Sequence, residues 1–193
     1  MIQTQNAADK VAVLIVGPSG SGKSTLEALL ETKYGYKKLV SSTTRPKRAG
    51  EVEGKPYNFI TEPEFERLIK DDALIEHVNY SGNFYGLSKK EVLSAGKSSV
   101  FVVEPSGVPH IVNFMKEHEI TPVTVYVHVS PDIVRERMAA RGDSPEAIAK
   151  RIDQDDIAKR AENMRFDVFI NSNITNPEEG AVQIDNLVQV LRW

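Results

Sequence analysis

The chain has 193 residues and a formal net charge of -3, with 40% hydrophobic and 26% charged residues, a composition typical of a single compact globular domain. It contains no cysteine, which excludes disulfides, thiolate metal sites and cysteine nucleophiles. No apolar run approaches the roughly 20 residues that a membrane span needs, residues 1–10 lack the apolar core of a signal peptide, and no basic excess points to nucleic acid. We therefore expect a cytoplasmic protein that binds neither membranes nor nucleic acid.

An apolar run at 11–16 predicts a buried strand, and a helical pattern follows at 26–31. Between them lies a segment with the spacing G-x-x-x-x-G-K-S of a phosphate-binding loop, whose glycines let backbone N–H groups approach an anion at a helix N-terminus. Lys23 can reach the β- and γ-phosphates, and the Ser24 hydroxyl is positioned to bind Mg²⁺. By itself this loop fits a nucleotide hydrolase, a switch or a kinase, rather than a chance glycine turn. The predicted ATP-binding residues are Gly17, Pro18, Ser19, Gly20, Ser21, Gly22, Lys23, Ser24 and Thr25.

A dense polar stretch at 41–51 follows a short strand predicted at Leu39–Val40. It carries hydroxyl groups and then three cations, Arg45, Lys47 and Arg48. Such a run is most often a solvated loop. In a chain that already binds a nucleotide, its arginines also suit a second phosphate, because the planar guanidinium donates two parallel hydrogen bonds.

The segment after the polar stretch alternates between strand and helix patterns. Short strand patterns at 57–60 and 73–78 flank an amphipathic helix at 62–70, and an extended segment resumes at 84–86. Together they predict that residues 41 to about 88 form a small, mixed, mostly β insertion in the main fold.

The main fold resumes with an uninterrupted apolar run at 100–103, which is typical of a buried parallel strand. Glu104 follows directly, at the edge where open α/β sheets bind ligands. Further along, the pattern predicts a strand at 123–129 and one long helix that opens near Pro145 and continues to about Met164.

The chain then has a short strand pattern at 167–170 and a helix from Pro177, with Val182, Leu187 and Val190 expected on its apolar side. The alternation of strands and helices predicts an α/β protein with a P-loop NTPase-type, mainly parallel sheet and helices on both faces, plus the small mixed insertion. The four histidines show no metal-ligand spacing.

The polar stretch belongs to a longer signature. The run from Ser41 to Phe59, S-S-T-T-R-P-K-R-A-G-E-V-E-G-K-P-Y-N-F, resembles the nucleotide-monophosphate-binding signature of the guanylate kinase family. Later segments match the family as well: Leu74-Ile75-Glu76-His77, Ser81-Gly82-Asn83-Phe84-Tyr85-Gly86, Arg137 with Arg141-Gly142, Lys150-Arg151, and Ile170-Asn171. The resemblance covers nearly the whole chain. It implies one guanylate-kinase-like domain over 1–193, with a core at about 1–40 and 98–193, a nucleotide-monophosphate-binding subdomain at about 41–97, and a helical lid at about 137–155.

The resemblance implies ATP-dependent phosphorylation of GMP or dGMP to the diphosphate by in-line transfer, with Mg²⁺ bound by Ser24 and the phosphates of ATP. A carboxylate suits guanine, because it can accept hydrogen bonds from N1–H and the exocyclic amine, and adenine lacks that donor pair. The family assigns acceptor binding to Ser41, Arg45, Arg48, Tyr57, Glu76, Tyr85 and Glu104. It places Asn171 near the adenine of ATP, and it assigns charge neutralisation in the transition state to Lys23, Arg45, Arg137, Arg141 and Arg151. On the sequence pattern alone, Arg137 and Arg141 fit an i, i+4 surface pair equally well.

Departures from the family pattern concern mainly the acceptor base. Val102-Val103-Glu104-Pro105-Ser106-Gly107 stands where the family has Asp-x-Asp-x-Gln-Gly, Leu87 replaces an expected base-contacting hydroxyl, and segments 87–97 and 142–150 look short. They leave open a related P-loop kinase with another acceptor, such as a different nucleotide or a sugar phosphate. A non-catalytic guanylate-kinase-like binding module is the alternative from a different class. The expected partners are ATP and GMP or dGMP, and the sequence leaves open a monomer or a homodimer.

Overall fold

The computed structural model describes residues 10–48, 50–80, 82–140, 142–154 and 156–192. The strands are β1 (Val11–Val16), β2 (Lys37–Lys38), β3 (Ser42–Thr43), β4 (Asn58–Phe59), β5 (Leu74–Tyr80), β6 (Asn83–Ser88), β7 (Ser98–Val102), β8 (Thr121–His128) and β9 (Val168–Asn171). The helices are α1 (Lys23–Tyr34), α2 (Glu62–Lys70), α3 (Lys89–Leu93), the 3₁₀ turn η1 (Pro105–Gly107), α4 (Val108–Glu117), α5 (Pro131–Ala140), α6 (Pro145–Gln154), α7 (Ile157–Ala161) and α8 (Pro177–Leu191).

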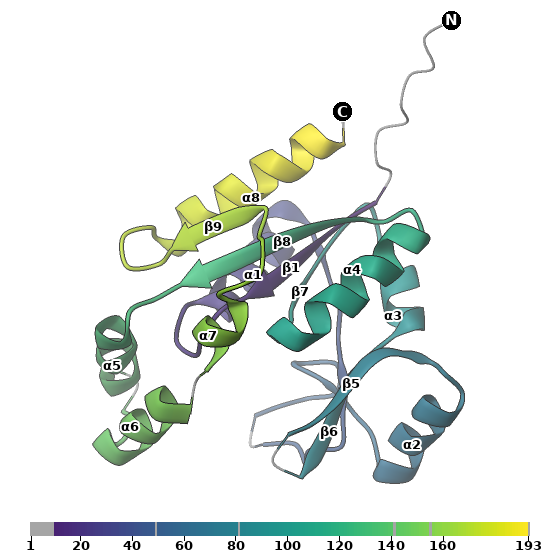
Figure 1. The fold of residues 1–193 in the computed structure, drawn as a ribbon, viewed down its shortest axis with the longest axis horizontal. Helices are drawn as coiled ribbons and strands as arrows, with labels where there is room; N and C mark the ends of the chain where they lie inside the picture. Colours follow the sequence, from purple (N-terminus) through teal and green to yellow (C-terminus); the bar gives the residue numbers. More distant parts are fainter. Residues whose placement is uncertain (1–9, 49, 81, 141, 155, 193) are drawn as a thin grey trace, which may run out of the picture.

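The strands form two sheets (Figure 1). The first is parallel throughout, in the order β2-β7-β1-β8-β9, and the second is mixed, in the order β4-β3-β6-β5. The α/β fold, the parallel sheet and the separate small mixed sheet predicted from the sequence are therefore confirmed.

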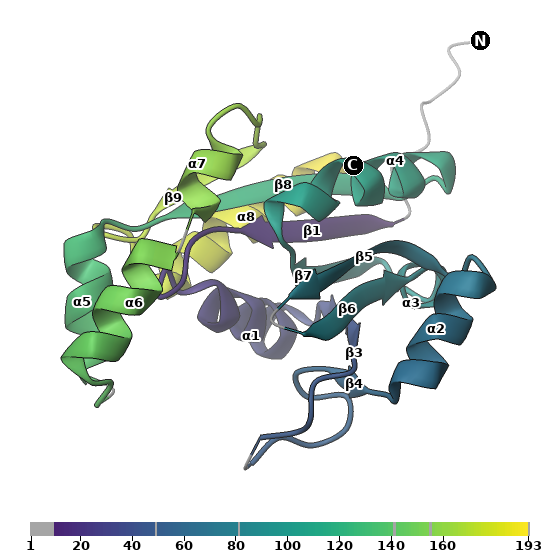
Figure 2. The ribbon, with the colours of Figure 1, turned by 60° about the horizontal axis from the view of Figure 1, so that its bottom comes forward.

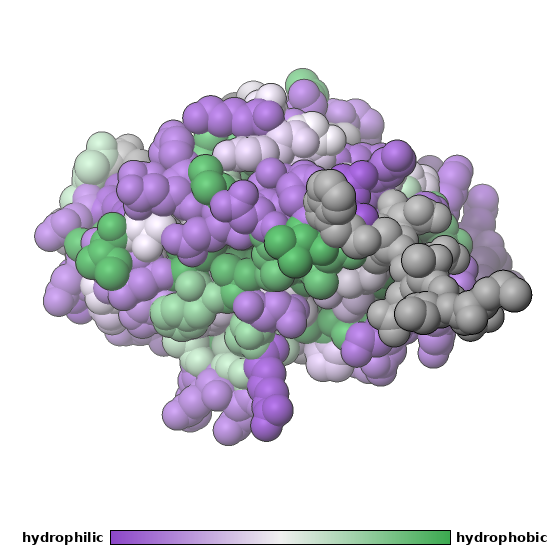
Figure 3. Space-filling view, turned by 90° about the horizontal axis from the view of Figure 1, so that it is seen from above, coloured by the Kyte–Doolittle hydropathy of each residue, from purple (hydrophilic) through white to green (hydrophobic). Residues whose placement is uncertain are grey.

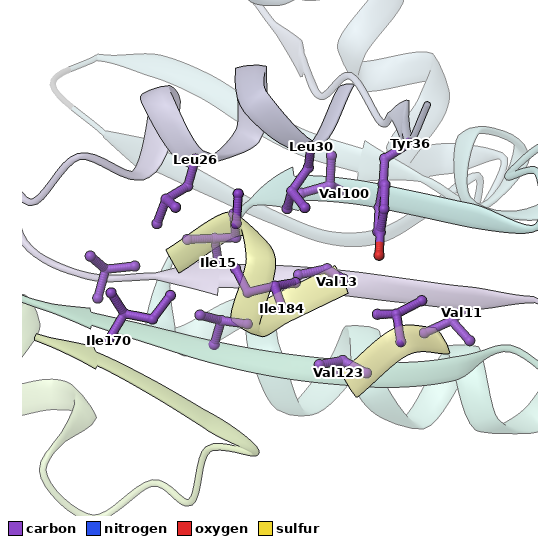
Figure 4. Packing of buried hydrophobic residues seen from close by; sticks show 14 residues of the cluster. Val11, Val13, Ile15, Leu26, Leu30, Tyr36, Val100, Val123, Ile170 and Ile184 are labelled. Atoms are coloured by element: carbon purple, nitrogen blue, oxygen red, sulfur yellow. The ribbon is translucent and has the colours of Figure 1, made fainter. Parts of the chain in front are cut away.

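Strand β1 is the centre of the parallel sheet, and all six of its residues are buried. Its residues alternate between the two faces, as a strand with helices on both sides requires. Val13 and Ile15 point towards α1 and α8, where Leu30 and Ile184 complete the cluster (Figure 4). The opposite face packs against α4, whose contribution includes Ile111. This sandwich fixes the C-terminal end of β1, from which the phosphate loop starts.

The apolar side of α8 differs in part from the prediction, although Leu187 packs against the core as expected. Val182 and Val190 are 43% and 69% exposed, whereas Ala181, Ile184 and Val188 are buried. The buried residues of α8 face the core because Gly180 lies against α1 and β9. A Cβ atom there would lie 3.0 Å from a Leu26 methyl carbon and 3.2 Å from an Ile170 methyl carbon, so the close approach requires glycine.

The single long helix predicted from Pro145 to about Met164 is also wrong. The chain forms two helices, α6 and α7, and Asp156 precedes α7 with the non-helical angles φ -95° and ψ 9°. The two helices pack into different clusters. Ile148 of α6 packs with Val134 and Met138 of α5, whereas Ala161 of α7 belongs to the core under the parallel sheet. A straight helix could not serve both clusters.

Figure 2 shows the second sheet and α2 below the parallel sheet, with α5 and α6 together at another end of the molecule. Phe65 of α2 is fully buried and stacks on Phe84 of β6, with ring centroids 5.4 Å apart. Gly86 of β6 lies so close to Phe65 that a Cβ atom would come within 3.0 Å of its ring. A short helix that the sequence did not predict, α3, follows β6 and is capped by Ser88.

No helix in the described part of the chain is long and apolar enough to cross a membrane. Figure 3 shows hydrophobic side chains along the middle of the face seen from above, bordered by hydrophilic ones. Among the residues that the structure describes, the large hydrophobic side chains with the highest exposed fractions are Ile174 (82%), Val190 (69%) and Phe169 (61%).

Candidate active site

The phosphate loop connects the buried end of β1 to α1. Gly22 is the N-cap of α1 with φ 94°, a left-handed conformation that favours glycine, and it supplies no side-chain cap to the first turn. The ammonium of Lys23 donates to the carbonyl oxygens of Gly17 and Pro18, at 2.6 and 2.7 Å. Lys23 therefore lies across the loop, at the N-terminal end of the α1 dipole, where an anion is stabilised.

Two other loop residues, Gly17 and Ser21, are closely packed. A Cβ atom at Gly17 would lie 2.4 Å from the Val127 carbonyl oxygen, so the loop can pass β8 at this distance only with glycine. The Ser21 side chain is 1% exposed and its hydroxyl lies beneath Gly17, while its N–H donates to the Pro18 carbonyl oxygen at 3.3 Å, so Ser21 shapes the loop from inside.

Ser24 has an exposed side chain on the first turn of α1, next to Lys23. A hydroxyl oxygen is a ligand that Mg²⁺ accepts. Val102, at the end of the neighbouring strand β7, brings no carboxylate to this place. No group of three or more His, Cys, Asp or Glu side chains suited to a metal occurs among the described residues. The donors here therefore fit an ion bound chiefly by triphosphate oxygens, with Ser24 as the protein ligand.

A second cationic centre lies on the small sheet. The Arg45 guanidinium lies 5.7 Å from the ring centroid of Tyr57 and 5.4 Å from that of Phe59, and Tyr57 packs edge-on against Tyr85 at 5.6 Å. Burial raises the pKa of Tyr57, and Tyr85 adds to the effect, so its hydroxyl is a neutral donor. One guanidinium and two tyrosine rings thus come together, and their N–H and O–H groups are donors suited to a phosphate.

Glu51 fixes this centre, and sequence reasoning missed it. Its carboxylate accepts from Arg45 Nη2 at 2.9 Å and from the Arg48 N–H at 2.8 Å. The hydrogen bond from Arg45 holds the pKa of Glu51 below its usual range. The carboxylate therefore links both predicted phosphate-binding arginines. The Arg48 side chain is exposed, and Ser41 is half-buried with its carbonyl accepting from the Asn58 N–H.

The position of Arg45 is set by the strand that precedes it. Thr43 is fully buried and donates to the Phe84 carbonyl oxygen at 2.8 Å, while its hydroxyl accepts from the Arg45 N–H at 3.2 Å. Thr44 accepts from the Phe84 N–H at 2.9 Å. The two threonines thus pin the start of the polar stretch to β6, which explains why hydroxyl residues precede the arginine.

Glu76 is a half-buried carboxyl on β5. Burial raises its pKa, the neighbouring Glu104 carboxylate raises it further, and a hydrogen bond from the Leu87 N–H opposes both. A Cβ atom at Gly107 would lie 3.3 Å from the Glu76 carboxyl carbon, so Glu76 packs directly on the backbone of η1. Leu87, cross-strand partner of Glu76, is fully buried and packs in the core. Its side chain therefore contributes to the protein interior.

Glu104 lies two residues beyond β7 and forms an ion pair with Arg160 of α7, at 3.0 Å. The Arg160 Nε atom also lies 2.8 Å from an oxygen of Asp156. Neither of these contacts of Arg160 was predicted, because α7 was expected to be part of a longer helix. Helix α7 packs against the core of the parallel sheet, and this brings Arg160 close to Glu104, which precedes η1.

A buried ion pair lies one helical turn beyond Ser24. Glu27 has a side chain 7% exposed, and its carboxylate lies 2.6 Å from the Lys38 ammonium. Burial raises the pKa of Glu27, and the hydrogen bonds from Lys38 and from the Val102 N–H lower it in part. Sequence alone did not distinguish Glu27, which stands in an ordinary helical pattern.

Arg137 connects α5 to the phosphate loop. Its Nη1 atom donates to the Gly20 carbonyl oxygen at 3.0 Å and to the Ser172 hydroxyl at 3.1 Å, and Nη2 donates to the Ser172 carbonyl oxygen at 2.7 Å. The surface-pair interpretation does not describe these contacts. Arg141 lies outside the described residues, and only the backbone of Arg151, in α6, is described.

Asn171 ends β9, next to Ser172. Its side-chain oxygen accepts from the Asn173 N–H at 3.1 Å, which shapes the turn that follows. The residue therefore lies at the same end of the parallel sheet as the phosphate loop, as parallel strands require.

A family model described as guanylate kinase matches residues 9–184. A guanylate kinase of Synechocystis is 35% identical over 162 residues, which cover 80% of this chain and 82% of that protein. One from Symbiobacterium thermophilum is 38% identical over 72% of this chain and 67% of its own length. The crystal structure of guanylate kinase from Anaplasma phagocytophilum superposes with a TM-score of 0.65 and 28% identity, covering 98% of this chain and 89% of that one.

Proposed function

Because this chain belongs to the guanylate kinase family and is an ATP-dependent nucleoside monophosphate kinase with guanylate kinase activity, we propose how its own residues divide that work. The loop from Gly17 to Thr25 binds the phosphates of ATP, and the small sheet binds GMP or dGMP. Arg45, Arg48, Tyr57 and Tyr85 bind the acceptor phosphate, and Glu76, with Ser41 and Glu104 nearby, reads the base.

One observation carries this proposal. Glu76 of the small sheet packs on Gly107 of η1, the turn that follows β7, and β7 pairs in parallel with β1, whose end leads into the phosphate loop. The carboxyl ends of these strands meet at one edge of the sheet, where α/β proteins bind ligands. The base-reading carboxyl and the phosphate loop therefore lie at the same edge, as transfer between two nucleotides requires.

The chemistry needs positioning and charge neutralisation more than a strong base, since the acceptor phosphate is already anionic. We assign Lys23 to the transferring phosphoryl group and Arg45 to the acceptor phosphate. Arg137, Arg141 and Arg151 neutralise charge from the lid, and Asn171 lies near the adenine. Mg²⁺, held by the phosphates and Ser24, supplies further charge neutralisation when bound.

The experiment that tests the acceptor is a coupled assay of ADP release with all common ribonucleoside and deoxyribonucleoside monophosphates. We expect GMP or dGMP to give the highest kcat/KM, because Glu76 accepts from the two adjacent donors that guanine offers. Equal or better turnover of AMP, a pyrimidine nucleotide or a sugar phosphate would sink the proposed base reading.

The subdomain boundaries at about 41–97 and 137–155, the cytoplasmic location, and the choice between monomer and homodimer stay predictions. Size-exclusion chromatography with light scattering decides the oligomeric state directly. Cell fractionation decides the location.

A further inference from the structure

We propose that Arg160 is a positioning residue for the acceptor base, because it holds Glu104 in an ion pair beside Glu76. The inference rests on the proposed function, in which Glu76 accepts hydrogen bonds from guanine. Arg160 stands outside the sequence motifs that carry the family resemblance. It adds a residue from α7, beyond the lid helices, to the group that supports acceptor recognition.

A series of short contacts connects α7 to the carboxyl of Glu76. Arg160 Nε lies 2.8 Å from Asp156, one turn earlier in the chain, which fixes the guanidinium on its helix. Its Nη2 atom lies 3.0 Å from the Glu104 carboxylate. The Glu104 carbonyl oxygen accepts from the Gly107 N–H at 3.0 Å, and Gly107 packs on Glu76. Arg160 thus anchors the residue at one end of the turn whose other end supports Glu76.

The charges around Glu76 explain why this anchor matters. The Leu87 N–H of β6 donates a hydrogen bond to the Glu76 carboxyl and lowers its pKa. The charge of Glu104, on the η1 side, raises the pKa of Glu76. Helix α4, which packs on β5, carries exposed titratable side chains: His110, Lys116 and Glu117. Two carboxylates therefore share this corner, and Arg160 is the cation bound to one of them. Without that cation, Glu104 would oppose ionisation of Glu76 more strongly, and a protonated Glu76 cannot accept both guanine hydrogen bonds.

The ion pair is partly solvated, with side chains 42% and 54% exposed, so screening limits its effect. We therefore expect a moderate change in acceptor affinity that depends on pH. A purely structural role would instead alter both nucleotide affinities together and leave the pH profile in place.

The experiment measures GMP binding to the whole protein by isothermal titration calorimetry between pH 5 and pH 9, without ATP. For Arg160→Gln we expect roughly three- to tenfold weaker binding at the acidic end, consistent with an exposed pair, and a smaller difference at the alkaline end. The pH midpoint of the profile should rise. Arg160→Lys should keep most of the wild-type profile, because the charge is retained. ATP binding should not change in either variant.

Two controls make the result specific. Arg135→Gln removes an exposed arginine that pairs with Asp132 on α5, and it should bind GMP as the wild type does. In a Glu104→Gln background, Arg160→Gln should have no further effect, because Arg160 acts through Glu104. An unchanged profile in Arg160→Gln, a persistent effect in the Glu104→Gln background, or an equal loss of ATP and GMP affinity overturns the inference.

Glu76→Gln separates this inference from the proposed function. If that variant binds GMP as tightly as the wild type, the assignment of Glu76 fails and the role of Arg160 fails with it. If Glu76→Gln loses GMP while Arg160→Gln keeps the wild-type profile, only the inference about Arg160 is overturned.

Discussion

The guanidinium of Arg137 donates a hydrogen bond to the carbonyl oxygen of Gly20 across 3.0 Å. This contact joins helix α5 to the centre of the phosphate loop, although 117 positions separate the two residues in the chain. The same guanidinium also holds Ser172, just beyond β9. Arg137 therefore fastens three segments at the end of the parallel sheet where the triphosphate binds in our proposal.

Arg137→Ala should lower both turnover and ATP affinity, because the loop loses a fixed donor and the lid loses its contact with the loop. We expect kcat to fall by roughly tenfold to a hundredfold, the range for one charge-assisted contact. Arg137→Lys should not restore activity, since one ammonium cannot replace a planar fork that reaches three oxygen atoms. Arg135→Ala, on the exposed side of the same helix, is the matched control, and a similar loss in that variant would contradict the role of Arg137.

Lys23→Ala should abolish nearly all turnover, by roughly a hundredfold or more, because the transferring phosphoryl group loses its positive partner. Steady-state assays with GMP and ATP measure the loss. Lys33, exposed in the last turn of the same helix, provides the control in Lys33→Ala. An unchanged kcat in Lys23→Ala refutes the assigned role of the loop.

Arg45→Ala should raise the KM for GMP by roughly tenfold to a hundredfold and change the KM for ATP much less, because the lost donor belongs to the acceptor phosphate. Initial rates with each substrate varied in turn give both constants. Arg67→Ala removes an exposed arginine from α2 of the same insertion and should leave both constants unchanged. A larger effect on ATP than on GMP would falsify the assignment of Arg45.

Glu76 gives the enzyme a predictable pH dependence. Burial and the Glu104 carboxylate raise the pKa of Glu76, so the carboxyl is protonated to a higher pH than an ordinary glutamate. In the proposed function guanine binds the ionised form, so kcat/KM for GMP should increase as pH rises through this pKa. Glu76→Gln should remove that increase and lower kcat/KM for GMP by roughly a hundredfold or more. Glu66→Gln, on the exposed side of α2, should reproduce the wild-type profile; a profile equally steep in Glu76→Gln would show that another group titrates.

The Glu27–Lys38 pair makes a prediction about stability. Lys38→Met leaves the Glu27 carboxylate buried without its cation, which should lower the free energy of unfolding by about 1–3 kcal/mol at neutral pH. The folded-state pKa of Glu27 is already raised, which means that folding favours the protonated carboxyl. The stability that comes from this preference is present at low pH and is lost as the pH rises through the folded-state pKa. Removing Lys38 raises the folded-state pKa further, and the destabilisation should therefore be larger at pH 8 than at pH 5.

Urea unfolding followed by circular dichroism at both pH values measures this difference. Lys37→Met removes the exposed neighbouring lysine and should change stability little at either pH. A Lys38→Met effect that is the same at pH 5 and pH 8 would mean that the lost interaction is packing by the lysine stem and not charge.

The sequence by itself determined the elements whose physics is local. The phosphate loop could be identified because its glycines and Lys23 must occupy fixed positions between a strand and a helix. The class of the fold followed from alternating strand and helix patterns. The acceptor side was predicted from Arg45 and Glu76, which lie in segments that resemble the family, and it stays a prediction. These features depend on neighbouring residues, so spacing along the chain was enough.

The tertiary structure decided everything that depends on residues far apart in the chain. It placed Arg160 on Glu104, Arg137 on Gly20 and Glu51 on Arg45, and it buried Leu87 in the core. It also broke the helix expected up to Met164, because α6 and α7 pack into separate clusters. Local sequence propensity cannot predict these features. Where a helix ends, and whether a side chain is buried, depend on the segments that pack against it. In this protein the motifs fixed which groups are available, and packing between distant segments fixed which of them meet.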